Sequence, residues 1–294
     1  MDYHLPRYEP SGALRPISIA FFLAAALAAC AAAIVYQLLL HYVPYMVLSI
    51  FVVLGAGWLL ATASAWCVRT GHLRHRGVAV LLSALLALVA LAASYYVDYR
   101  SGLARMAAAG ATADQLAATT LDVWLRARIH AGWSIDSHGS LSQFDGPYAV
   151  GLLWLIEAGT LVGFAVAGAL EVASVPYCEK CERWTSGLRI VVPGRARADV
   201  DAHLRAGDLT SVAGLAPPES ADNQIGIELL ARVCEQCKET AFLDVSELRI
   251  VKKRRVETKT TKLVRAATLG AEARAKLLER FNQLVVKKEP TIAA

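Results

Sequence analysis

The chain has 294 residues, of which 56% are hydrophobic, and its mean hydropathy is +0.42. This composition excludes an ordinary soluble globular protein, in which apolar residues make up about 45–50% of the chain. The formal net charge of +5 belongs entirely to the C-terminal part. Residues 1–175 carry nine Lys or Arg and nine Asp or Glu, whereas residues 176–294 carry 21 and 16. The chain therefore joins a neutral, apolar half to a basic half.

Four apolar blocks dominate the neutral half, and each is close to the ~20 residues that a helix needs to cross a bilayer. They cover residues 17–40, 43–68, 78–97 and 148–175. Backbone hydrogen bonds must close within the segment in lipid, so we expect four transmembrane helices. The first block is too long for the core of a signal peptide, and we expect it to be retained.

Arginines in one short loop predict the orientation. Arg69, Arg74 and Arg76 lie between the second and third blocks, whereas the turn after the first block has no Lys or Arg. The positive-inside rule places the arginine-rich loop in the cytoplasm. Because four spans return the chain to its starting side, we expect both termini in the cytoplasm of a bacterium, and a multi-pass protein of its inner membrane.

The segment between the third and fourth blocks is too long to be a simple connector. Leu121, Trp124, Leu125 and Ile129 recur in it at helical spacing. We expect one or two amphipathic helices here, outside the cytoplasm.

Beyond residue 175 the pattern changes to that of a mixed α+β domain. Apolar runs predict strands over 188–192, 225–233, 241–251 and 258–265, with short helices over 195–215 and a loop over 216–223. A final amphipathic helix is predicted from one apolar stripe, formed by Leu277, Leu278, Phe281, Leu284 and Val285.

Two Cys-x-x-Cys pairs are the strongest chemical signal in the chain. They are Cys178 with Cys181 and Cys234 with Cys237. Two such turns supply four sulfurs for one tetrahedral Zn²⁺, and four thiolates leave no position open for water. We therefore predict one structural zinc ion. Two alternatives remain: disulfides, if the topology is inverted, or a redox or iron site.

At these cysteines the chain resembles the zinc-ribbon group, in which two such turns at the ends of β-hairpins share one zinc. The resemblance covers about residues 177–251. The chain departs from the zinc-ribbon pattern in the spacing of its two pairs, which are separated by 52 residues. In common zinc sites the pairs are separated by roughly 15–20 residues. The chain also departs at Glu182 and Lys238, where glycine often follows the second cysteine. As a whole, the chain resembles bacterial multi-pass inner-membrane proteins with a C-terminal zinc ribbon, which implies a location rather than a mechanism.

The predicted fold is thus an α-helical membrane protein with a C-terminal α+β zinc-ribbon-like domain. Its predicted parts are a cytoplasmic N-terminus (1–16), three transmembrane helices (17–97), an extracytoplasmic amphipathic segment (98–147), a fourth transmembrane helix (148–175), a cytoplasmic zinc-ribbon-like domain with a helical insertion (176–256), and a basic strand with an amphipathic helix (257–294).

Glu157 lies well inside the fourth block, where a carboxylate is costly and marks a candidate site. Topology suggests partners at matching depth: Tyr36, Gln37, Ser49, and Tyr95 or Tyr96. The residue either passes protons or cations or, as we favour, fixes helix packing through hydrogen bonds. On another face of the same helix, Gly159, Gly163 and Ala167 form a small-residue stripe that suits close helix packing.

A basic cluster, Lys252, Lys253, Arg254 and Arg255, follows the predicted 241–251 strand. It suits a solvated face, anionic headgroups or nucleic-acid phosphates. The chain has no Walker loop, dinucleotide fingerprint, zinc-protease motif or nucleophile elbow, so we expect no enzyme.

Three functions remain at this point. The first is a membrane-anchored zinc-binding scaffold or sensor that uses its tail to bind a protein partner or a second copy of itself. The second is a small oligomeric channel or transporter regulated by the tail. The third is a membrane-tethered nucleic-acid binder.

Overall fold

The computed structural model describes residues 3–42, 46–131, 133–137, 140–144, 147–218, 224–252 and 256–286. The chain forms two compact units. One is Ser11–Ser174, and the other combines Met1–Pro10 with Val175–Ala294.

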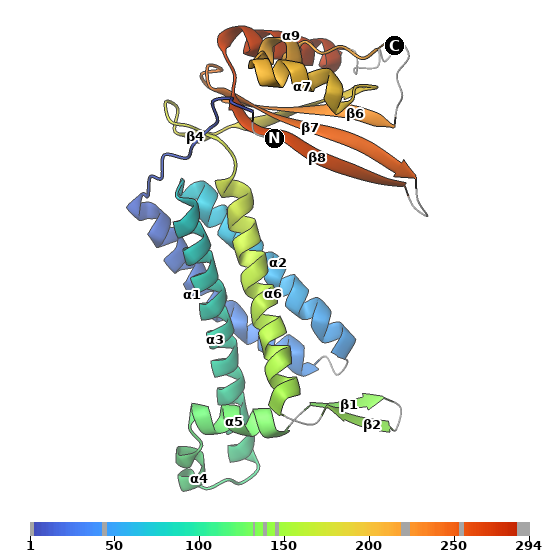
Figure 1. Cartoon of the computed structure of the whole chain (residues 1–294). Helices are drawn as coiled ribbons and strands as arrows, with labels where there is room; N and C mark the ends of the chain where they lie inside the picture. The colour runs from blue at the N-terminus through green and yellow to red at the C-terminus, as the bar shows by residue number, and fades with distance from the viewer. Residues whose placement is uncertain are drawn as a thin grey trace, which may run out of the picture. The chain divides into compact units, whose positions relative to one another are not determined.

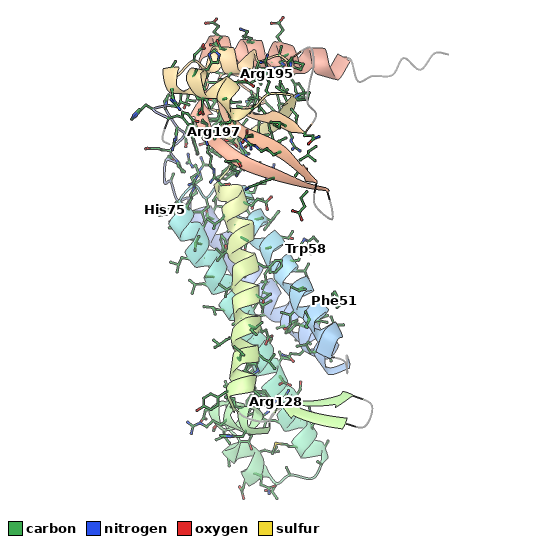
Figure 2. The ribbon with its side chains drawn as sticks, turned by 45° about the vertical axis from the view of Figure 1, so that its right-hand side comes forward. Phe51, Trp58, His75, Arg128, Arg195 and Arg197 are labelled. Carbon is green, nitrogen blue, oxygen red and sulfur yellow. The ribbon has the colours of Figure 1, made fainter. Side chains whose placement is uncertain are left out.

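Four long helices make up most of the first unit (Figure 1). They are α1 (Pro16–Tyr42), α2 (Met46–Thr70), α3 (Arg76–Ala108) and α6 (Pro147–Ala173). All four are long and apolar enough to cross a membrane, as predicted from the sequence. Large apolar side chains point outward from them, including Phe51 and Trp58 of α2, which are 65% and 62% exposed (Figure 2). Such outward apolar surface is what a bilayer covers, so the chain is a membrane protein.

The four helices pack in a closed arrangement. α6 packs mainly against α2 and α3, and α1 likewise packs mainly against α3 and α2. α2 and α6 approach each other closely at Gly168, where an added Cβ would lie 2.2 Å from the carbonyl oxygen of Ala61. A Cβ added at Gly57 of α2 would lie 3.1 Å from the ring of Phe164. Small residues therefore bring these two helices together, as is common in membranes.

The segment between α3 and α6 contains more structure than the sequence predicts. α3 continues to Ala108, eleven residues past the predicted end of the span. α4 (Ala113–Ala118) begins with a capping box between Thr112 and Gln115, and α5 (Leu121–Ala131) coincides with the predicted amphipathic stripe. A short hairpin, β1 (Trp133–Ser137) and β2 (Ser140–Phe144), follows. Its strands are too short for periodicity to reveal them.

The second unit contains a four-stranded antiparallel sheet in the order β5-β6-β7-β8. The strands are β5 (Ser186–Pro193), β6 (Ile225–Val233), β7 (Ala241–Lys252) and β8 (Val256–Thr268), and each lies where a strand was predicted. The helices α7 (Arg197–Ala206), α8 (Leu209–Ala213) and α9 (Ala271–Val286) contribute to the core on one face of this sheet (Figure 1). The resulting core includes Leu204, Val212, Leu229, Leu243 and Leu277.

The N-terminal segment belongs to this second unit, which the predicted boundaries did not foresee. Tyr3 and Leu5 are buried in its core. The amide of Tyr8 donates to the carbonyl of Ala266 over 2.9 Å, and the amide of Thr268 donates to the carbonyl of Pro6 over 2.8 Å. The segments predicted as 1–16 and 257–294 therefore do not stand apart. Both complete the fold that begins after α6, so the two ends of the helical unit lead into one domain.

The amphipathic stripe of α9 packs into the core of its own domain. Leu277 is buried, and Leu278 and Phe281 pack against the core of the same domain. The side chains of Leu284 and Val285 lie outside the described part of the structure. The described part of the stripe is thus used within the chain and is not a free docking surface.

Candidate metal centre

The first cysteine pair lies on a small hairpin. β3 (Tyr177–Cys178) pairs with β4 (Arg183–Trp184), and the turn between them carries Cys181. The hairpin is held by the rings of Tyr177 and Trp184, whose centroids lie 5.1 Å apart. The hydroxyl of Thr185 also donates to the carbonyl of Pro176 over 2.8 Å. Trp184 therefore packs against the hairpin.

The second cysteine pair lies in the turn that joins β6 to β7. The amide of Cys234 donates to the carbonyl of Thr240 over 3.0 Å, and the amide of Lys238 donates to the carbonyl of Cys234 over 2.9 Å. These bonds close a tight loop that directs two thiols to the same side. The 52-residue gap between the pairs contains β4, β5, α7, α8 and β6. The gap is therefore an insertion folded into the domain core.

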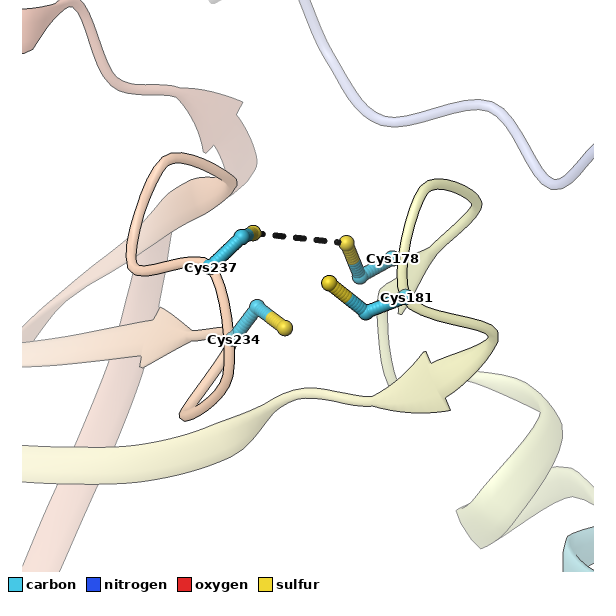
Figure 3. Close-up of side chains that lie close together, drawn as sticks. All are labelled: Cys178, Cys181, Cys234 and Cys237. Carbon is cyan, nitrogen blue, oxygen red and sulfur yellow. Dashed lines mark hydrogen bonds between the residues drawn. The ribbon is translucent and has the colours of Figure 1, made fainter.

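The four thiols converge on one point, although the two turns are far apart in sequence (Figure 3). The Sγ atoms of Cys178, Cys181, Cys234 and Cys237 all lie within 4.8 Å of one another, and Cys178 Sγ is 3.7 Å from Cys237 Sγ. A tetrahedron of sulfurs about 2.3 Å from a zinc ion has edges of about 3.8 Å. The arrangement thus has the size of a four-thiolate site, and these cysteines could hold a metal ion.

Both turns use a left-handed residue where glycine is common. Glu182 and Lys238, each directly after the second cysteine of its pair, have φ values of 51° and 53°. This is the region in which glycine is the default and other residues are uncommon. The backbone therefore adopts the conformation that a glycine would favour, without the glycine.

Local hydrogen bonds and burial shift the pKa values of two of the cysteines in opposite directions. Backbone amides of Thr240 and Glu239 lower the pKa of Cys237 to about 6, which favours the thiolate form that binds metals. Burial, followed by hydrogen bonding with the other three cysteines, raises the pKa of Cys181 to about 12. The hydroxyl of Thr240 also lies 3.3 Å from Cys178 Sγ. The sequence analysis did not include Thr240 in the site, because its position shortly after the second pair is the only local sign of its contact with the thiols.

An ion pair joins the two turns. Lys180 Nζ lies 2.7 Å from Glu239 Oε2, and both side chains are largely exposed. The guanidinium of Arg274, near the start of α9, donates to the carbonyl of Glu239 over 2.6 Å. The second turn is therefore linked both to the first turn and to the C-terminal helix.

Glu157 has two of the predicted partners. Tyr36 donates to Glu157 Oε1 over 2.5 Å, and Tyr95 donates to Oε2 over 3.0 Å. Tyr96 instead lies beside Tyr99, with ring centroids 6.1 Å apart, and the side chain of Ser49 is outside the described part. The carboxyl group of Glu157 thus joins three helices.

The small-residue stripe does not form the close helix contact within this chain. Gly159, Gly163 and Ala167 are exposed, and no described side chain or neighbouring backbone lies within 4 Å of a Cβ added at Gly159 or Gly163. α6 packs through a different face, which carries Leu161, Ala165 and Gly168.

Most of the basic cluster lies outside the residues that the structure describes. Lys253, Arg254 and Arg255 lie outside the described residues, and Lys252 is described only as the last residue of β7.

Comparison with known protein families, with curated proteins and with solved structures finds no match to this chain. The fold and the sites therefore carry the functional argument alone.

Proposed function

We propose that the chain is a membrane-anchored zinc-binding module, whose metal site stabilises a domain that binds a protein partner at the cytoplasmic face. The convergence of four cysteine thiols within 4.8 Å carries this proposal. Four thiolates suit Zn²⁺ and leave it no open coordination position, which favours a structural role over catalysis.

A zinc-ribbon-like arrangement accounts for the way the thiols are presented. One pair lies on the β3–β4 hairpin and the other on the β6–β7 turn, and both turns adopt left-handed backbone after the second cysteine. The β5–β6 and β6–β7 pairings then extend from the metal into the core. The metal would fix the two turns to each other.

Two observations support a cytoplasmic position for this domain. The arginine-rich loop favours the cytoplasmic side. The packing of Tyr3 and Leu5 into the domain after α6 is consistent with four spans whose two ends emerge on one side. With four spans, that side is also the side of the arginine-rich loop. We propose a bacterial inner membrane as the location, on the resemblance described above.

The sheet offers the surface for a partner. Ile190 and Leu229 face the core, so alternation places Arg189, Val191, Glu228, Arg232 and Asp244 on the opposite face, called here the charged sheet face. The same face carries Leu230 and Phe242, and the ring of Tyr8 packs on Phe242. Arg189 pairs with Glu228, and Arg232 lies 3.2 Å from Asp244. Val191 is 46% exposed among these charges. Charges of both signs around an apolar residue suit a protein partner better than a polyanion.

Metal content per chain on detergent-purified protein tests the first part of the proposal. We expect about one zinc ion per chain, and none in a Cys178→Ser/Cys234→Ser double variant. A Cys30→Ser/Cys67→Ser variant is the matched control, because those thiols lie in α1 and α2 and should not affect the metal. Zinc-free protein with disulfides between the four cysteines would contradict both the site and the orientation.

Site-specific crosslinking in cells tests the second part. A photoreactive residue at Val191 should capture a discrete protein, whereas the same residue at the exposed Ala275 of α9 should not. Equal capture at both positions, or capture of nucleic acid from Val191, would contradict a protein-binding sheet face.

A channel or transporter remains the second candidate, because Glu157 lies inside the helical unit with hydrogen-bond partners on two other helices. Ion flux in proteoliposomes that is lost in Glu157→Gln would support this function. Unchanged flux, or none in the unaltered protein, would leave Glu157 outside any transport role.

A further inference from the structure

The outer edge of β8 is open along most of its length. β8 is the last strand of the sheet, and residues 257–262 are all exposed. The N-terminal segment covers one end of this edge, through the bridge between Arg7 and Ala267. Among the described residues, no other strand pairs with the outer side of 257–265, which is called here the β8 edge. Figure 1 shows β7 and β8 continuing past the end of β6.

Three cations lie along the β8 edge, and all three are exposed: Lys259, Lys262 and Arg265. Lys262 is opposite Ser246, on the charged sheet face, whereas Lys259 is opposite Arg249, on the other face. Because β8 is the outermost strand, both lysines can reach a surface that covers its edge. The cations are three residues apart, about 10 Å along an extended strand. Each can therefore meet a separate anion.

The acidic residues of the neighbouring strand β7 are paired elsewhere. Asp244 lies 3.2 Å from Arg232, and Glu247 lies 3.1 Å from Arg249. Within the described part of the chain, the three cations of the β8 edge have no acidic partner at ion-pair distance. Glu257 is the one acidic residue in 257–265, so three cations and one acid leave this edge with a net charge of +2.

The other side chains of the β8 edge suit phosphate groups. Thr258, Thr260 and Thr261 are exposed between the cations. Phosphate oxygens accept hydrogen bonds from both hydroxyl and ammonium groups. The chain has no aromatic residue from Val245 to Thr268, so the edge lacks the rings on which single-stranded nucleic acid stacks. Lysines along an open edge also oppose pairing with a strand of another protein.

Short links join the domain to a membrane span at each of its two ends. Residues 11–15 lie between its N-terminal segment and α1, and residues 174–176 lie between α6 and β3. A tether of this kind raises the effective concentration of lipid headgroups at the domain. Lipid phosphates therefore have an advantage over phosphates that must arrive from solution.

We propose that the β8 edge binds anionic lipid headgroups and thereby fixes one side of the domain on the bilayer surface. A basic residue near an anionic membrane contributes about fivefold to binding. The three cations of the edge act together, because one lipid surface meets all of them. The contact adds a third point of attachment to the two covalent links, which limits rotation of the domain about those links.

Hydrogen exchange of the full chain in lipid nanodiscs tests the proposal. Discs of phosphatidylcholine alone are compared with discs that also contain the anionic lipid phosphatidylglycerol. We expect amides of the β8 edge to exchange at least about fivefold more slowly in the anionic discs, the factor that one cation contributes. Amides at the centre of β6 should be unchanged. In about 1 M salt the difference should disappear, because the Debye length falls to about 3 Å.

Variants separate the charge of the edge from its fold. Lys259→Gln/Lys262→Gln/Arg265→Gln should exchange like the unaltered chain in the neutral discs but lose the slowing in the anionic discs. Lys259→Arg/Lys262→Arg should keep the slowing, because it retains the charge. Lys276→Gln removes an exposed cation from α9 and should also keep it.

Three outcomes would overturn the proposal. The first is equal exchange of the β8 edge in both kinds of disc, or a slowing that survives in the triple variant. The second is an equal slowing at the centre of β6, which would mean that the lipid stabilises the whole domain. The third is protection of the β8 edge in neutral discs by added duplex DNA but not by phosphatidylglycerol, which would assign the edge to nucleic acid.

Discussion

Tyr3 donates a hydrogen bond to a carboxylate oxygen of Asp201, 198 positions further along the chain. Asp201 also pairs with Arg197 at 3.3 Å and Arg205 at 3.5 Å. Leu5, two residues after Tyr3, is buried in the same core. The N-terminal segment is therefore held both by a charged hydrogen bond and by apolar packing in a domain whose remaining residues follow α6.

Removing this packing should weaken the domain even though the change lies before the first membrane helix. Leu5→Ala should destabilise it by about 2–4 kcal/mol, the usual cost of truncating a buried leucine. His4→Ala is the control, because His4 is exposed. Hydrogen exchange of β7 and α7 amides in the full chain measures the effect. Equal exchange in both variants would show that the segment is not part of the core.

The hydrogen bond from Tyr3 predicts a dependence on pH. Together with the neighbouring arginines it lowers the pKa of Asp201, so the folded pKa lies below the unfolded value of about 3.9. Stability from a lowered carboxyl pKa is present above the unfolded value and is lost as the pH falls through the folded one. Tyr3→Phe should therefore be less stable than the unaltered protein by about 1–2 kcal/mol near neutral pH. The difference should shrink below about pH 4, and a difference that grows in acid would contradict this assignment.

Metal removal should loosen the two turns before it affects the sheet. With a chelator, amides of 177–185 and 234–240 should exchange faster, whereas those at the centre of β6 remain protected by the core. Cys178→Ser should have the same effect without a chelator. Lys180→Ala is the matched control, because an exposed ion pair contributes about 0–1 kcal/mol and should leave metal binding nearly intact. Exchange that is insensitive to the chelator would argue against a resident metal.

The left-handed residue of the second turn gives a separate test of the turn geometry. Lys238→Gly should bind zinc at least as tightly as the unaltered chain, because glycine adopts this conformation without strain. Lys238→Val should bind more weakly, since a β-branched residue is a true outlier there, with strain of order 1–3 kcal/mol. Competition with a chromogenic chelator measures both affinities. The opposite order would mean that the turn changes when metal binds.

The sequence predicted the parts of this protein that depend on local pattern. The length of the apolar blocks predicted the four long helices, and shorter apolar runs predicted the four strands of the main sheet. Depth along the helices proposed Tyr36, Gln37, Ser49, and Tyr95 or Tyr96 as partners of Glu157, and Tyr36 and Tyr95 are among its hydrogen-bond partners. What it missed depends on tertiary context. Nothing local to Tyr3 and Leu5 reveals that they complete a core formed more than 180 residues later. The closeness of Gly168 to Ala61 was equally hidden, because it depends on how α6 is rotated against α2.

Two glycines of α6 test how this helix is rotated against α2. Gly168→Ala would place a methyl group 2.2 Å from the carbonyl oxygen of Ala61, so α2 and α6 must move apart. We expect a clear loss of thermal stability in detergent. Gly163→Ala meets no described neighbour and should be neutral or stabilising by up to about 1 kcal/mol, because alanine favours the helix.

The larger change Gly163→Leu then distinguishes lipid from a second chain at the exposed stripe. If lipid covers Gly163, this variant should keep the elution volume of the unaltered protein in size-exclusion chromatography. A shift to a smaller species would show that the stripe of Gly159, Gly163 and Ala167 packs against another copy, because only a close helix contact excludes the added side chain.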